Sequence, residues 1–138
     1  TVASMRRLFT ASADFFAVLV FAFIGRMNHA EGLSLHGLFS TTWPFALGAA
    51  IGWSLAYLYA HMRADHGFDY PFHPERVFPD GVLVWIGAVA IGMILRQQFH
   101  QGVALSFIIV ATIVLGVFLL GWRAARMVLS RRRQTVTT

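Results

Sequence analysis

Four stretches of apolar residues, separated by short polar segments, dominate the chain. They lie at about 12–28, 38–60, 81–98 and 102–122. Each is close to the roughly 20 helical residues that cross a hydrocarbon core about 30 Å thick. The pattern predicts an all-α fold: a polytopic membrane protein with four transmembrane helices in a single domain, followed by a basic tail over 123–138.

The composition agrees with this pattern. Hydrophobic residues make up 57% of the 138 residues and charged residues only 12%, whereas about a quarter of the residues in a soluble domain are charged. Four spans leave almost no chain for a domain outside the membrane, so any activity must reside in the spans and their connections. The chain has no cysteine, which excludes disulfide bonds and thiol chemistry.

The arginines predict an orientation. Every basic residue is arginine, and a cytoplasmic N-terminus leaves only Arg26 and Arg96 on the outer side of the membrane. An excess of positive charge marks the cytoplasmic side of membrane proteins. We therefore expect a multi-pass protein of the cytoplasmic (inner) membrane with both termini in the cytoplasm. The basic ends favour contact with anionic lipid headgroups, and we expect no binding of nucleic acid.

A short segment of the chain recurs. Segment 26–32 is echoed by segment 96–102: both begin with arginine and end with glycine, and Glu31 corresponds to Gln101. The first and third spans run in the same direction, as do the second and fourth. The echo therefore predicts an internal repeat of two parallel helical hairpins, related by a pseudo-twofold axis along the membrane normal.

Small residues recur at helical spacing within the spans. Gly48, Gly52 and Ala56 lie four residues apart and so share one helix face. Gly92 and Gly116 offer similar notches in the third and fourth spans. Such faces let helix backbones approach closely in membranes. Packing within the chain is the favoured interpretation, and a homodimer interface is the alternative.

The connection 61–80 is the most polar part between the spans. It contains histidines and aspartates that could hold a divalent metal ion, but their spacing fits no metal-binding motif. A solvated loop is the favoured interpretation, and we predict no metal site and no cofactor.

Asp14 is a carboxylate inside the first apolar stretch. A carboxylate within a membrane is costly unless it is paired, protonated or hydrated, and such residues are often functional. The alternative is an aspartate in the first turn of a helix that begins late, where it would favour the positive helix end. The fourth span returns to the same depth in the membrane as Asp14. If Asp14 is buried, its expected ion-pair partner is therefore Arg123 or Arg126.

Arg26 and Arg96 are the two arginines expected on the outer side of the membrane, where positive charge is otherwise rare. The predicted symmetry would bring them together near the pseudo-twofold axis. Two guanidinium groups there would repel each other unless an anion lay between them. Glu31 can neutralise one arginine, but Gln101 cannot neutralise the other. The arrangement suits a phosphate, a carboxylate or a lipid headgroup. The favoured alternative is snorkelling, in which the arginine stems lie in lipid and the heads at the surface.

The sequence resembles a family of small four-span membrane proteins, found mainly in actinobacteria and described as a domain of unknown function. The resemblance rests on VLVFAFIGRMNHAEGLS, TTWPFALG, VWIGAVAIGMILR and ALSFIIVATIVLG, and it covers Asp14 to Trp122. It implies a membrane location and four spans, and it implies no activity.

Two functional hypotheses follow. The first is binding or transport of a small anionic solute or lipid headgroup, with Arg26 and Arg96 as anion ligands and Asp14 as a proton-coupling or gating group. The second is an accessory or assembly subunit that packs its small residues against a larger membrane complex. An enzyme is the weakest hypothesis, because neither a cysteine nor a metal-spaced histidine cluster supplies a reactive centre.

Overall fold

The computed structural model describes residues 2–27, 33–63 and 72–137. Four helices make up most of this part of the chain: α1 (Val2–Met27), α2 (Leu35–Met62), α3 (Val82–Gln98) and α4 (Leu105–Val136). The described residues contain no strand. The prediction of an all-α fold with four helices is therefore confirmed.

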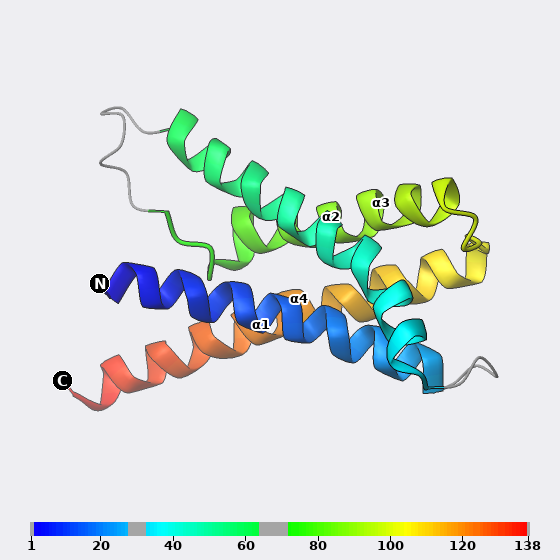
Figure 1. Ribbon diagram of the computed structural model, residues 1–138. Coiled ribbons are helices and arrows are strands. Elements are labelled where there is room, and N and C mark those ends of the chain that lie inside the picture. Colours follow the sequence, from blue (N-terminus) through cyan, green and yellow to red (C-terminus); the bar gives the residue numbers. More distant parts are fainter. Residues whose placement is uncertain (1, 28–32, 64–71, 138) are drawn as a thin grey trace.

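The four helices form an elongated bundle (Figure 1). Helices α1 and α3 run in one direction along it, and α2 and α4 run in the other. Both chain ends lie at the same end of the bundle, which we call the terminal end. The last turns of α1 and α3 lie at the opposite end, which we call the distal end (Figure 1).

Three helical segments are long and apolar enough to cross a membrane: Val2–Met27, Val77–Gln98 and Leu105–Val136. By the length and composition of these segments, the chain is a membrane protein. Helix α2 is also long enough, but serines, threonines and tyrosines lower its mean hydropathy. Pro44 lies inside α2, and the first turns of the helix run at an angle to the rest (Figure 1), as expected where a proline removes a backbone hydrogen bond.

Helix α1 buries one face and exposes the other. Its buried residues are Thr10, Asp14, Ala17, Val18, Phe21 and Ala22, spaced by one, three or four positions as for a single helix face. The helix begins at Val2, well before the expected start of the first span. Asp14 therefore lies in the helix interior, and its interpretation as a first-turn aspartate is wrong.

Helices α2 and α3 pack backbone against backbone. A side chain on Gly48 would place its Cβ 2.5 Å from the carbonyl oxygen of Gly87, and one on Gly52 would place it 2.5 Å from the carbonyl oxygen of Leu83. Neither position has room for a larger residue. Close approach of this kind is how small residues stabilise helix pairs in membranes.

The ring of Phe45, fully buried, fills the centre of the bundle. It lies against Gly92 of α3, and its edge meets the ring of Phe21 at a centroid distance of 5.1 Å. Helix α4 joins the bundle through Trp85, whose ring covers Gly116. Helix α4 then continues past the other helices to Val136, so most of the segment expected to be a tail is helical.

Candidate functional site

A pocket of about 260 Å³ lies at the distal end, between the last turns of α1 and α3 and the first turn of α4. Its polar lining residues are Arg26, Thr41, Arg96 and Gln101, and apolar side chains such as Phe21 complete the wall. The pocket contains the two arginines that the sequence singled out. No acidic residue is present among the described residues that line it.

Arg26 enters the pocket from the last turn of α1. Its Nη1 donates a hydrogen bond to the Thr41 hydroxyl of α2 at 3.2 Å. Its guanidinium lies directly over Gly37, where any side chain would overlap it. Gly37 belongs to the first turn of α2, which Ser34 caps by accepting a hydrogen bond from the Gly37 backbone N–H at 3.0 Å. The glycine therefore leaves the space that Arg26 occupies.

Arg96 enters from the last turn of α3 and is held by the turn that follows. Its Nη1 donates to the side-chain oxygen of Gln101 at 3.3 Å and its Nη2 to the Gln101 backbone carbonyl at 3.1 Å. Its guanidinium also lies 4.5 Å from the centroid of the Phe107 ring on α4, a cation–π contact. These contacts fix the head of Arg96 in the pocket wall instead of leaving it in the lipid.

The chain reverses after α3 through His100. The Gln101 N–H bonds to the Arg96 carbonyl at 2.8 Å and the His100 N–H to the Gln97 carbonyl at 3.3 Å, the pattern of a Schellman helix end. Glycine usually occupies the left-handed position in this motif, but His100 does so here with φ 57°. Gly102, the last residue of the recurring segment 96–102, also has a positive φ of 86°, two residues later.

A second polar site lies at the terminal end, where Asp14 and Arg123 form a buried ion pair. Nη1 and Nη2 of Arg123 donate hydrogen bonds to Oδ1 and Oδ2 of Asp14 at 2.6 and 2.7 Å, a forked arrangement. The indole N–H of Trp122 also donates to Asp14, at 3.0 Å. Arg123 is therefore the partner of Asp14 on α4, and it is fully buried, although it is the first residue of the segment expected to be an exposed tail.

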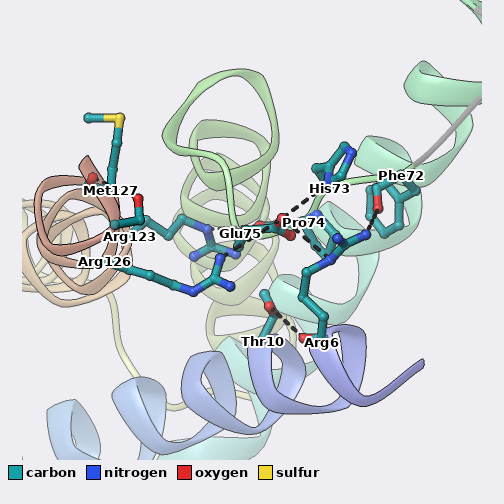
Figure 2. A network of polar contacts seen from close by, with 10 residues as sticks. Arg6, Thr10, Phe72, His73, Pro74, Glu75, Arg123, Arg126 and Met127 are labelled. Atoms are coloured by element: carbon teal, nitrogen blue, oxygen red, sulfur yellow. Dashed lines mark hydrogen bonds and ion pairs between the residues drawn. The ribbon is translucent and has the colours of Figure 1, made fainter. Parts of the chain in front are cut away.

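Arg123 also holds the segment that leads into α3. Its Nε donates to the Pro74 carbonyl at 3.0 Å (Figure 2). Gly81, in the wide π-type turn Val77–Gly81 before α3, makes this possible, because a Cβ there would lie 2.7 Å from Arg123 Cδ. One side chain thus links α1, α4 and the entry to α3. We call Asp14, Arg123 and their contact with Pro74 the clamp.

Glu75 is the centre of a neighbouring cluster (Figure 2). Its carboxylate oxygen lies 3.4 Å from Arg6 Nε, 3.1 Å from His73 Nδ1 and 3.9 Å from Arg126 Nη1. Arg6 also donates to the Phe72 carbonyl at 3.3 Å. The cluster therefore ties α1 and α4 to the segment 72–76 beside the clamp.

The small residues of the predicted packing faces turn toward other helices of the same chain. Gly48 and Gly52 meet α3, Gly92 meets Phe45, and Gly116 meets Trp85. Ala56 is also buried, at 1% exposure.

Glu31 lies outside the described residues, as do Asp65, His66 and Asp69 of the connection 61–80. His73 contacts Glu75. Among the described residues, no group of three or more metal-ligating side chains comes together.

Several residues that build these sites were not recognised from the sequence. Glu75 belongs to a connection that was interpreted as a solvated loop, and no role was predicted for Gly37 or Gly81. Glu75 follows a proline and precedes an arginine, and only the fold reveals that Arg6 and Arg126 reach it. No local sequence pattern marks the two glycines, because the arginine side chains beside them come from other helices.

A family model described as a protein of unknown function (DUF3054) matches residues 11–126. The match confirms the resemblance to a family of unknown function. No curated protein and no solved structure matches the chain at a significant level.

Proposed function

The chain belongs to this family of proteins of unknown function, and we propose that it binds a small organic anion in the distal pocket. One observation carries the proposal. Arg26 and Arg96 come from two different helices and line one pocket. Guanidinium groups that line the same pocket can both donate hydrogen bonds to one anion.

The pocket lining suggests the chemical class of the anion. Guanidinium groups bind carboxylate and phosphate oxygens through forked hydrogen bonds, and Thr41 and Gln101 add neutral polar groups. Phe21 and Phe107 supply an apolar wall. A volume of about 260 Å³ lies below the roughly 300–1,000 Å³ of pockets for drug-sized ligands. The ligand is therefore a small carboxylate or phosphate with a short apolar part, either free in solution or as a lipid headgroup.

Transport is the further step of this proposal. With both termini in the cytoplasm, the pocket would face the outer side and the clamp would close the inner side. Passage of an anion then requires the Asp14–Arg123 pair to separate. The acidic partner of the pair gives such a gate a group that can take up a proton.

The alternative role, an accessory subunit of a larger complex, has less support. It relied on small-residue faces, and Gly48, Gly52, Gly92 and Gly116 contact their own chain. An accessory subunit would need a different contact surface. Co-purification with a stoichiometric partner from native membranes would favour it.

The binding proposal is tested by thermal unfolding of the purified protein in mild detergent. Inorganic phosphate, succinate and glycerol 3-phosphate are titrated at constant ionic strength. A ligand that binds only the folded protein stabilises it by about 2.7 kcal/mol at a concentration of 100 times its Kd. We expect stabilisation of the wild type by at least one of these anions, and loss of that stabilisation in Arg26→Gln and Arg96→Gln.

Two further variants separate binding from folding. Gln101→Glu keeps both arginines and the side-chain shape but places a carboxylate in the pocket, so we expect it to fold and to lose the anion response. Arg131→Gln removes one positive charge from the exposed end of α4 and should respond as the wild type does. Equal stabilisation by anions in all variants would show that the pocket is not the binding site.

A further inference from the structure

A groove of about 540 Å³ opens at the terminal end, at the other end of the molecule from the distal pocket. One side is formed by Arg76, Val77 and Phe78 at the entry to α3, and the other by Arg126 and further residues of α4. The α4 side comprises Arg123, Arg126, Met127 and Ser130, which follow one another at spacings of three, one and three residues and so share one helix face.

The groove carries excess positive charge. Arg76 and Arg126 are exposed on its two sides, and Arg133 continues the same helix face two turns beyond Arg126. Arg123 is neutralised by Asp14. The acidic residue among the described lining residues is Glu75, whose oxygen already lies nearer to Arg6 than to Arg126. The groove is therefore complementary to an anion.

The same groove has an apolar floor. Phe78 is 74% exposed and Met127 is 42% exposed, and both border the groove together with Val77. Met127 lies where the apolar part of α4 ends and its arginines begin, and Phe78 lies across the groove from it. A free inorganic anion gains nothing from these side chains, whereas a molecule with a charged head and an acyl chain contacts both parts of the groove.

From this combination we infer that the groove binds one anionic phospholipid from the leaflet at the terminal end. The phosphate lies between Arg76 and Arg126, and the first part of an acyl chain covers Phe78 and Met127. Basic pockets beside membrane spans bind anionic headgroups in this way. The inference is independent of the anion proposed for the distal pocket, because the two sites share no lining residue.

The test measures lipid retention by native mass spectrometry. The purified protein in mild detergent is titrated with phosphatidylglycerol or with phosphatidylcholine. We expect about tenfold tighter binding of the first phosphatidylglycerol molecule, equivalent to about 1.4 kcal/mol. The double variant Arg76→Gln/Arg126→Gln should reduce this preference to near one.

The matched control is Arg63→Gln/Arg132→Gln. It removes the same number of positive charges from exposed residues that do not line the groove, and we expect it to keep the lipid preference. Equal loss in both double variants would assign the preference to overall charge and overturn the inference. Equal binding of the two lipids by the wild type would overturn it as well.

Met127→Gln tests the apolar part of the site. The exposed methionine can be replaced without loss of packing in the bundle, so the variant should fold normally and bind phosphatidylglycerol severalfold more weakly. Inorganic phosphate at millimolar concentration should not displace the lipid. Unchanged lipid binding in Met127→Gln, or displacement by phosphate, would identify an anion site without a lipid contact and contradict the inference.

Discussion

The α2–α3 contact and the α1–α4 contact would be equivalent under the predicted pseudo-twofold axis, yet they are held together in different ways. Helices α2 and α3 meet through glycine, with Gly52 directly on the backbone of α3. Helices α1 and α4 meet through a charged pair, Asp14 and Arg123, in a buried setting. The predicted repeat therefore does not extend to the interactions that join the helices.

The difference shows two ways in which helices can be held together in a membrane. Helices in a membrane gain no hydrophobic free energy by leaving lipid for each other, so they associate by close packing or by polar contacts. Close packing needs small residues along a length of helix and permits little movement. A buried ion pair concentrates the attraction at one point and can be broken by a change in one charge. A substitution at one charged residue should therefore weaken the α1–α4 contact more than a substitution at one glycine weakens the α2–α3 contact.

The largest effect is expected at the ion pair. Asp14→Ala leaves the Arg123 guanidinium buried without its counter-charge, and removing one partner of a buried pair costs about 3–5 kcal/mol. We expect a loss of this size in the free energy of unfolding, measured by titration with SDS in mixed micelles. A loss below 1 kcal/mol would show that Arg123 finds another partner and that the pair does not hold α1 to α4.

The double variant Asp14→Leu/Arg123→Met sharpens this result. Replacement of both charged groups by apolar ones of similar size is often neutral or stabilising. We expect the double variant to recover most of the stability lost by Asp14→Ala, while the Pro74 carbonyl loses its donor. Additive losses from the two substitutions would contradict the description of the pair as one unit.

The next effect concerns the glycine contact. Gly52→Leu places a side chain against the carbonyl of Leu83 and the Cα of Val84, and overpacking of this kind costs about 1–3 kcal/mol. Thermal unfolding in detergent measures it. Gly121→Leu is the matched control, because nothing lies within 4 Å of a Cβ at that position. Leucine has a higher helix propensity than glycine, so similar losses in both variants would contradict the attribution of the effect to close packing.

The smallest effect is expected between α3 and α4. Their described residues form neither a glycine–backbone contact like that of Gly52 nor an ion pair like that of Asp14. Trp85 donates one hydrogen bond to the Thr112 carbonyl at 2.9 Å. Trp85→Phe keeps an aromatic ring over Gly116 and removes the donor, so the loss should be near the average of about 0.6 kcal/mol for interhelical hydrogen bonds in membranes. Trp43→Phe, which removes an indole packed edge-on against Phe99, is the control in the same unfolding assay. A larger loss in the control would contradict this ranking.

Much of the fold could be predicted because its causes are local. Apolar stretches of membrane-spanning length identified the four helices, and the spacing of Gly48 and Gly52 identified a face suited to close packing. The partner of Asp14 could be narrowed to Arg123 or Arg126, since the direction of the spans returns α4 to the level of Asp14. These inferences need only helix geometry and the number of crossings.

Other features depend on contacts that no local pattern records. Helix α1 begins at Val2, and Arg6 near its start contacts Phe72 and Glu75 of another segment, whereas the polarity of this stretch suggested a later start. Glu75 looked solvated because its cationic neighbours come from the two ends of the chain. In both cases the deciding neighbour lies outside the local stretch of sequence.

The clamp also sets the order in which the protein can be completed during synthesis. Asp14 precedes Arg123 by 109 residues, so the carboxylate of α1 is synthesised well before the arginine that pairs with it. Until α4 has been made, the contact that joins α1 to α4 cannot form.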